Sequence, residues 1–415
     1  MSRETKKQSP HLWRKAVSAI SRRRFFRTFF AGLLGGLAAF PGMKGWAASP
    51  YALPSVRDDE RKRLRDLGIN LGRLPTGRFN AITDVEGVKV GHTTKISGSG
   101  ELDVGVGPVR TGVTVIMPHD GNIFKEKLAV GHYILNGNGE MTGFVRDRAE
   151  GTLETPIFLT GTANIGLVYD AALTYLLAEN PEIGVTAPVP VPVVAECWDS
   201  LGDIEGRHIT EQDVLDAIAG ASGGPVEEGA VGGGTGMRSY GFKAGIGTAS
   251  RVLDAEQGGY TVGVLVHANH SARRLLRVDG VPVGEELLRY PEDEEEKSKS
   301  IILVAATDAP LLPIQLQRLC KRMSMGLART GSVATHGSGD ILIAFSTANR
   351  GEAAPFRWAG DRIVSSLWEA TVEATEEAAI NALTAAPTMD GVNGVVRHGL
   401  PLDRLVAIME KYNRL

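Results

Sequence analysis

Ser300 is the residue whose surroundings most clearly suggest covalent chemistry. The charged, mostly acidic stretch Pro291–Lys299 runs up to it, and the continuous apolar segment Ser300–Ala306 follows. If the chain were cut before Ser300, this serine would carry a free α-amine beside its own hydroxyl. A terminal amine with a pKa of about 7.7–8.0 can act as general base for the adjacent Oγ. The alternative is a serine that simply begins a strand after a solvated linker.

A second hydroxyl and a carboxylate stand close together further along the chain. Ser338 and Asp340 lie two residues apart, where an apolar segment begins. On extended backbone, residues two apart point to the same face, so this pair could orient or relay a proton at the start of a neighbouring strand. The alternative is a tight turn in which the aspartate accepts hydrogen bonds from backbone donors.

Three other motifs do not predict a site. The glycine-rich run 229–236 lacks both the lysine of a Walker loop and the third glycine of a Rossmann fingerprint. Residues 220–224 match G-x-S-x-G, but a predicted helix precedes them where a nucleophile elbow needs a strand, so we interpret them as a helix C-cap and turn. His267 and His270 have no carboxylate close in sequence, and we predict no metal site.

The composition is that of a globular protein and excludes several functional classes. Of 415 residues, 43% are hydrophobic and 22% are charged, which excludes a disordered or fibrous chain. The net charge of −3 argues against nucleic-acid binding, which requires a positive surplus. The two cysteines, Cys197 and Cys320, exclude a disulfide scaffold and a Cys-rich metal site, and we interpret both as buried thiols.

Residues 1–47 are predicted to be a signal peptide for the twin-arginine export pathway. Consecutive arginines at 22–24 precede the uncharged run Thr28–Met43, and small residues near Ala47 suit a signal peptidase. The alternative is a membrane anchor, but a span needs about 20 apolar residues, more than this Gly-interrupted run provides. We therefore expect a periplasmic or otherwise exported protein with no stable membrane anchor.

The elements that must position the candidate residues form a layered α/β pattern. Apolar or alternating runs predict strands at 87–91, 112–117, 155–159, 185–196, 260–267, 300–306 and 340–345. The run at 185–196 is predicted to be an edge strand because its prolines cannot donate to a ladder. Helices are predicted at 164–177, 211–219, 314–327, 358–385 and 402–412, and within 51–73. These elements mix without a strict βαβ rhythm, which favours layered α/β with much antiparallel sheet.

From about Leu67 to Tyr412 the chain resembles the DmpA family, the L-aminopeptidase D-amidase/esterases and β-peptidyl aminopeptidases. The ordered matches are the segments 80–85, 90–94, 107–113, 136–143, 232–237, 242–251, 264–269, 300–302, 306–311, 337–340 and 344–349. The family fold is a four-layer αββα sandwich, similar to the N-terminal-nucleophile hydrolases but differently connected. The resemblance implies one domain over 48–415 that cleaves itself between Lys299 and Ser300 into the chains 48–299 and 300–415.

The resemblance also implies a role for each site residue. Ser300 would be the nucleophile, Ser338 and Asp340 would assist it, and Asn269 would donate to the oxyanion. Glu140 would be a buried acid that pairs with the free amine of the substrate. The family needs no metal or cofactor and tends to form homo-oligomers, here of αβ units. The expected substrates are small peptides and aminoacyl amides or esters, which lose their N-terminal residue through an acyl-enzyme on Ser300.

Three positions depart from the family pattern, and two alternative functions stay open. Lys299 stands where glycine or asparagine is expected, whereas Ala230 and Gly202 each replace an expected asparagine near the substrate loops. One alternative is an acyltransferase on the same fold, which passes the acyl group to an amine instead of water. The other, suggested by Lys299, is an unprocessed periplasmic peptide-binding protein without turnover.

Overall fold

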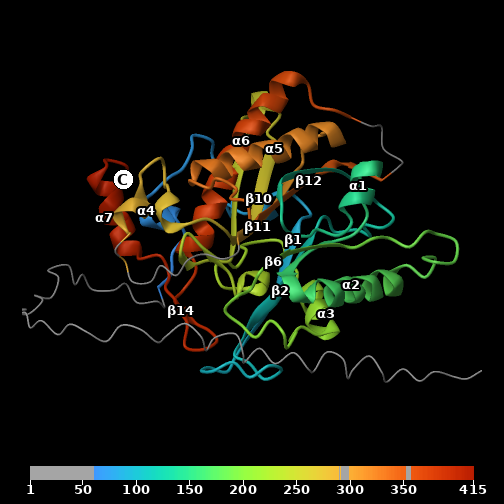
Figure 1. Ribbon diagram of the computed structural model, residues 1–415. Helices are drawn as coiled ribbons and strands as arrows, with labels where there is room; N and C mark the ends of the chain where they lie inside the picture. The colour runs from blue at the N-terminus through green and yellow to red at the C-terminus, as the bar shows by residue number, and fades with distance from the viewer. Residues whose placement is uncertain (1–59, 289, 291–298, 352–356) are drawn as a thin grey trace, which may run out of the picture. The chain divides into compact units, whose positions relative to one another are not determined.

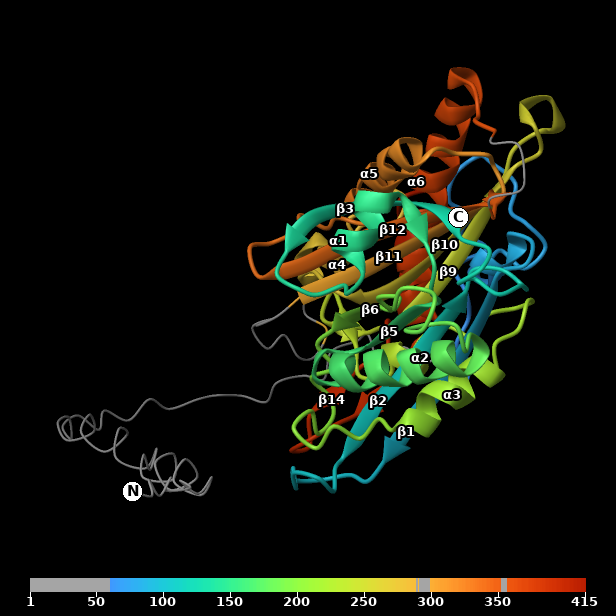
Figure 2. The same cartoon turned by 90° about the vertical axis from the view of Figure 1, so that its right-hand side faces the viewer.

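Two stacked β-sheets organise the chain (Figures 1 and 2). The computed structural model describes residues 60–288, 290, 299–351 and 357–415. The chain divides into two units, Met1–Pro54 and Ser55–Leu415, and every element described below belongs to the second. The signal peptide predicted over residues 1–47 lies outside the described residues, as does most of the acidic stretch before Ser300.

The smaller sheet has the strand order β1-β2-β5-β6. Its strands are β1 (Lys89–Ser97), β2 (Val109–Met117), β5 (Ile157–Gly161) and β6 (Val193–Cys197). The pairs β1–β2 and β2–β5 are antiparallel, whereas β5 and β6 are parallel and are connected through helix α2 (Ile165–Glu179). This order leaves β6 at an edge, where the sheet has room for another segment.

The larger sheet has the strand order β4-β3-β12-β11-β10-β9. Its strands are β3 (Leu128–Gly137), β4 (Thr152–Leu153), β9 (Ile246–Val252), β10 (Thr261–Asn269), β11 (Lys299–Thr307) and β12 (Ser338–Arg350). Strand β11 lies in the middle, antiparallel to β10 and parallel to β12, to which helix α5 (Pro313–Arg329) connects it. Two short hairpins lie outside both sheets: β7 (Arg238–Ser239) with β8 (Phe242–Lys243), and β13 (Met389–Asp390) with β14 (Val396–Arg397).

Three apolar cores separate four layers. One core lies between the sheets and contains alternate residues of facing strands, such as Leu159 of β5, Ile302 of β11 and Ile341 of β12. A second joins the larger sheet to α5 and α6 (Asp361–Thr384), and a third joins the smaller sheet to α2 and α3 (Glu211–Ala219). Figure 2 shows the two helix layers on opposite sides of the stacked sheets. The predicted αββα sandwich is thus the observed architecture.

The other helices of the described residues are shorter than α2, α5 and α6. They are α1 (Phe144–Glu150), α4 (Val283–Glu286) and α7 (Leu402–Lys411), with 3₁₀ turns at Arg65–Leu67, Ile82–Asp84, Thr162–Asn164, Gly232–Gly234, Ala255–Gln257 and Arg273–Leu275. None of the helices in the described part of the chain combines the length and apolar character that crossing a bilayer requires.

Most predicted elements are observed, but one predicted helix is wrong and two long strands were missed. The buried strands predicted at 260–267, 300–306 and 340–345 are β10, β11 and the first part of β12, and the helix predicted at 211–219 is α3. The helix predicted within 51–73 is wrong for its described part, which contains only the turn Arg65–Leu67. There the arginines donate to distant groups, as Arg63 does to the carbonyls of Phe79 and Asn80. Strands β3 and β9 were not predicted.

A buried ionic network fastens the N-terminal part of the described chain to α6. The fully buried guanidinium of Arg251 on β9 donates to Glu373 Oε2 at 3.0 Å, to Glu377 Oε2 at 2.7 Å and to the carbonyl of Leu71 at 2.7 Å. Arg65 donates to the same Glu377 carboxylate at 2.7 Å. These hydrogen bonds from Arg65 and Arg251 hold the pKa of Glu377 below its usual range despite burial.

The substitution Arg251→Leu removes the guanidinium that two buried carboxylates, Glu373 and Glu377, share. Removing one member of a buried ion pair costs about 3–5 kcal/mol, so we expect the free energy of unfolding in urea to fall by that amount. The matched control is Lys411→Ala, which removes a solvent-exposed ion pair with Glu286 and should change stability little. Equal stability of the two variants would contradict a structural role for the network.

Candidate active site

Ser300 lies at the beginning of the central strand of the larger sheet. Its Cα is paired with Asn269 at the end of β10 and with Gly339 at the beginning of β12. The side chain is only 3% exposed. Residues two apart on a strand point to the same face, so Ser300 shares its face with Ile302 and not with Ile301. Ile302 faces the core between the two sheets. Ser300 thus lies between the end of β10 on one side and the beginning of β12 on the other.

Asn269 is held in one orientation directly across from Ser300. Its Oδ1 accepts a hydrogen bond from the backbone N–H of Arg238 at 3.1 Å, and its Nδ2 donates to the carbonyl of Trp198 at 3.1 Å. An amide group has two N–H donors, and the bond to Trp198 uses one of them. The position is compatible with the predicted oxyanion role because the side chain is fixed by two backbone groups.

Ser338 and Asp340 point to the same face, as their spacing predicted, and they are hydrogen-bonded to each other. Ser338 Oγ donates to Asp340 Oδ1 at 2.6 Å, and both side chains are buried. The register places Ser338 beside Lys299 and Asp340 beside Ile301, so the pair brackets the level of Ser300. Burial raises the pKa of Asp340 to about 6, and the hydrogen bond from Ser338 opposes this rise.

Hydrogen bonds join the end of β3 and the segment that follows it to the beginning of β12 and the residues just before it. Asn138 donates through its backbone N–H to the carbonyl of Ser338 at 3.2 Å and through Nδ2 to the carbonyl of Gly337 at 2.8 Å. Asn136 Nδ2 donates to the carbonyl of Thr335 at 2.7 Å. A Cβ atom on Gly339 would lie 2.5 Å from the carbonyl oxygen of Asn138, so this close approach requires glycine.

Glu140 lies beside these residues, but the prediction that it is buried is wrong. Its side chain is exposed, because the segment after β3 leaves the sheet before reaching this residue. A cavity of about 580 Å³ opens next to Glu140 and is lined largely by apolar side chains, including Met141, Phe144, Val191 and Ile341. A carboxylate at the edge of an apolar cavity suits a ligand with a cationic group and an apolar side chain.

The buried carboxylate of this region belongs to Glu196, which the sequence reasoning did not select. Glu196 lies on β6 and is 5% exposed. Its Oε1 accepts the backbone N–H of Glu140 at 3.1 Å, and its Oε2 accepts the hydroxyl of Thr162. The available signal was a single acidic residue inside the apolar run Val193–Cys197, where a charge requires a partner.

The remaining sequence motifs have structural roles. The Gly220–Gly224 motif follows α3, with Gly220 as its C-cap. His267 is buried and its Nε2 contacts the carbonyl of Gly233 at 2.9 Å. Cys197 and Cys320 are both buried free thiols. Gly202 packs so closely that a Cβ would lie 2.8 Å from the backbone nitrogen of Arg110.

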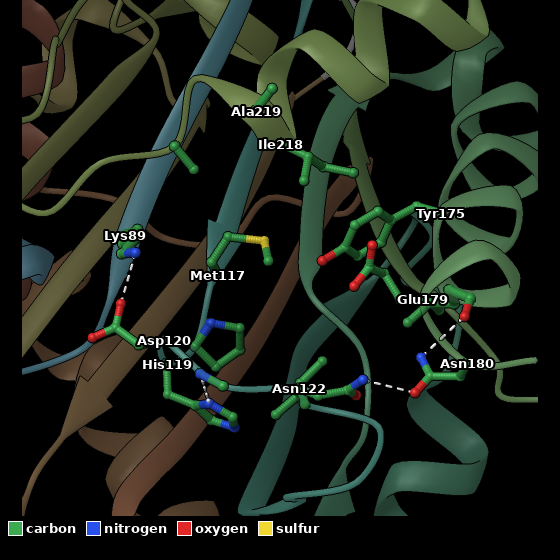
Figure 3. Close-up of a pocket in the computed structure, with 15 residues that line it drawn as sticks. Lys89, Met117, His119, Asp120, Asn122, Tyr175, Glu179, Asn180, Ile218 and Ala219 are labelled. Atoms are coloured by element: carbon green, nitrogen blue, oxygen red, sulfur yellow. Dashed lines mark hydrogen bonds and ion pairs between the residues drawn. The ribbon is translucent and has the colours of Figure 1, made fainter.

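A second cavity, of about 420 Å³, lies between the ends of β1 and β2 and helices α2 and α3 (Figure 3). Lys89 and Asp120 form an ion pair of 2.7 Å there, and Asn122 donates to Asn180 at 2.7 Å. Because these polar side chains pair with one another and none of the predicted site residues lines the cavity, we do not assign the active site to it.

Comparison with known proteins identifies the family. The model of peptidase family S58 matches residues 80–397. The chain belongs to peptidase family S58. It is 44% identical over 389 residues to the β-peptidyl aminopeptidase BapA of Sphingosinicella microcystinivorans, with 88% of this chain and 96% of that protein aligned.

Solved structures give the same result for the fold. The PH0078 protein from Pyrococcus horikoshii OT3 matches this S58 peptidase with a TM-score of 0.82 and 49% sequence identity, covering 85% of this chain and 100% of that one. The L-aminopeptidase D-Ala-esterase/amidase of Ochrobactrum anthropi, described as a serine aminopeptidase with a variant of the Ntn hydrolase fold, matches with a TM-score of 0.78 and 40% identity, covering 85% and 99%.

The S58 peptidase is therefore a serine-type aminopeptidase of the N-terminal-nucleophile class. This confirms the family resemblance, the fold class and the enzyme class that were predicted from the sequence. It also favours an enzyme over the alternative of a binding protein without turnover. The roles of the individual site residues stay predictions.

The contact between Gly339 and Asn138 provides a test of this geometry. We expect Gly339→Ala to lower aminopeptidase activity at least tenfold, because the added Cβ displaces the segment that carries Glu140. Gly337→Ala is the matched control, since a Cβ there would meet nothing within 4 Å, and it should keep nearly full activity. Steady-state rates on an aminoacyl anilide measure both variants, and equal activity would contradict the requirement for glycine at 339.

Proposed function

We propose that the S58 peptidase activates itself by cleaving the Lys299–Ser300 bond and then uses Ser300 as an N-terminal nucleophile. The observation that carries this proposal is the position of Ser300 at the start of β11, directly across from Asn269 and level with the Ser338–Asp340 pair. The residues proposed as nucleophile, proton acceptor and amide donor thus lie at the ends of three neighbouring strands.

Self-cleavage proceeds through an ester. Ser300 Oγ attacks the carbonyl carbon of Lys299 and gives up its proton, and the C–N bond breaks as the Ser300 nitrogen takes a proton and becomes the free amine. Water then hydrolyses the ester, which leaves a carboxylate on Lys299 and restores the Ser300 hydroxyl. The products are a chain that ends at Lys299 and a chain 300–415.

Catalysis repeats the same attack on a substrate. Ser300 Oγ, deprotonated by its own amine or by the Ser338–Asp340 pair, attacks the first carbonyl of the substrate, and Asn269 donates to the oxyanion. The leaving amine takes a proton as its C–N bond breaks, and an acyl-enzyme remains. Water hydrolyses the acyl-enzyme and releases the N-terminal residue. Apart from water and the substrate, each step uses groups of this chain.

The substrate class follows from the cavity beside Glu140. We infer that Glu140 pairs with the free ammonium of a peptide, amide or ester, and that an apolar N-terminal side chain occupies the cavity of about 580 Å³. The name of the BapA relative supports β-amino acid residues among the N-termini accepted. We also propose export through the twin-arginine pathway, supported by residues 1–47, and assembly of αβ units into a homo-oligomer.

Replacing the nucleophile tests self-cleavage directly. Purified wild-type protein should yield a fragment whose N-terminal sequence is Ser300-Ile301-Ile302, whereas Ser300→Ala should stay a single chain. Intact mass and Edman sequencing measure both. Ser324→Ala is a suitable control, since Ser324 lies on α5 and its hydroxyl bonds only the local carbonyl of Lys321, and it should cleave normally. Cleavage of Ser300→Ala at the same bond would overturn the proposal.

The oxyanion role of Asn269 predicts a rate effect without loss of the fold. Asn269→Ala removes the amide donor, so we expect kcat to fall by about 10²–10³, the usual loss for one oxyanion donor. The thermal unfolding temperature should serve as the control for folding. A variant that keeps wild-type kcat would exclude Asn269 from the reaction.

The Ser338–Asp340 pair predicts a pH dependence. The pKa of Asp340 is raised to about 6, so its carboxylate is ionised above that pH and becomes protonated below it. If the pair accepts the proton of Ser300, kcat should fall as the pH decreases through about 6, and Asp340→Asn should lower kcat and abolish this acidic limb. An unchanged limb in Asp340→Asn would assign the proton acceptor elsewhere, for example to the Ser300 amine.

A further inference from the structure

Glu140 and Glu196 form a directly opposed pair of acids. The segment after β3 adds to the free edge of β6, with Met141 bridged to Ala195, and the N–H of Thr142 donates to the carbonyl of Val194 at 2.9 Å. In the same register the N–H of Glu196 donates to the carbonyl of Glu140 at 3.3 Å. Like charges directly opposite each other on paired strands are unfavourable, and a cation bound beside both would offset this repulsion.

The carboxylate of Glu196 has capacity for such a cation. A carboxylate offers about four acceptor positions. In Glu196 two of them are occupied, one by the Glu140 N–H and one by the Thr162 hydroxyl. Each of its oxygens therefore keeps acceptor capacity. The group is nearly buried, and a buried charge interacts more strongly with a counter-ion than an exposed one does.

Glu196 is also close to the position of the nucleophile. A Cβ atom on Gly139 would lie 3.2 Å from Glu196 Oε1 and 3.2 Å from the Cα of Gly339. Gly139 therefore lies between the carboxylate and Gly339, which is the strand partner of Ser300. A single residue, Gly139, thus separates the Glu196 carboxylate from the strand partner of Ser300.

We propose that Glu196 is the second acid of the substrate-amine subsite, a positioning residue that holds Glu140 and adds buried negative charge beside it. The inference rests on the proposed function and deepens it. The ligand class is a primary ammonium attached to an apolar residue, and the two acids together make the subsite select the charged amine over a neutral group of the same shape.

Several titratable groups surround Glu196. Burial raises its pKa, the hydrogen bonds from Thr162 and from the backbone of Glu140 lower it, and the charge of Glu140 raises it again. The charge of Glu196 contributes to raising the pKa of Cys197, on the same strand, and of Asp199, just after it. The charge of Asp340 on β12 also raises the pKa of Cys197. Because the pKa is raised, acidification neutralises Glu196 at a higher pH than an ordinary glutamate.

The test compares inhibition by isopentylamine and by isopentyl alcohol, which have the same shape but differ in charge. The wild-type enzyme should bind the amine more tightly than the alcohol, and this preference is the ratio of the inhibition constant of the alcohol to that of the amine. Glu196→Gln should reduce the ratio at least fivefold. The same substitution should raise KM more than it lowers kcat. Thr162→Val keeps the carboxylate but removes a hydrogen bond that lowers its pKa. Thr162→Val should keep the preference for the amine near neutral pH. As the pH is lowered, this variant should lose the preference at a higher pH than the wild type does.

The outcomes separate this inference from the proposed function. Cleavage at Lys299–Ser300 and kcat are recorded on the same samples. If Glu196→Gln cleaves itself and turns over with an unchanged amine-to-alcohol ratio, Glu196 has no part in amine selection, although the role of Ser300 stands. If Glu196→Gln fails to fold, the inference is overturned instead when Thr162→Val loses the preference for the amine at the same pH as the wild type. Absence of cleavage in the wild type would refute the proposed function itself.

Discussion

The pairing of β11 with two different neighbours is the constraint on which the site depends. The antiparallel ladder with β10 sets Asn269 across from Ser300, and the parallel ladder with β12 sets Gly339 on its other side. Because a shift of one residue in either ladder would turn Ser300 to the other face of the sheet, the buried apolar residues that fix the register also fix the chemistry. The continuous apolar character of β10, β11 and β12 is therefore a condition of the site.

The edge of the smaller sheet contributes the second half of the site. Strand β6 is left unpaired on one side by its place in the sheet, and the segment that carries Glu140 fills that edge. Asn136 at the end of β3 and Asn138 in this segment bind the backbone just before β12. One stretch of chain thus connects the two sheets at the end where Ser300 lies, and it brings Glu140 beside Glu196 there.

The sequence predicted the parts of this arrangement that depend on local pattern. Ser338 and Asp340 were expected on one face from their spacing alone, and their hydrogen bond confirms this. The strands β10 and β11 were recognised because they are buried on both faces and therefore uniformly apolar. The role of Glu196 was missed because its partner, Glu140, lies 56 residues away, and only the tertiary fold pairs the two. The exposure of Glu140 likewise depends on where its segment leaves β3.

Covalent labelling of the active enzyme tests the central claim most directly. A sulfonyl fluoride reacts with an activated serine, so treatment should stop aminopeptidase activity and add one label to the chain that begins at Ser300, with peptide mapping locating it on that residue. The same reagent should leave Ser300→Ala unlabelled. Labelling of Ser338, or of a residue in the chain that ends at Lys299, would contradict Ser300 as the nucleophile.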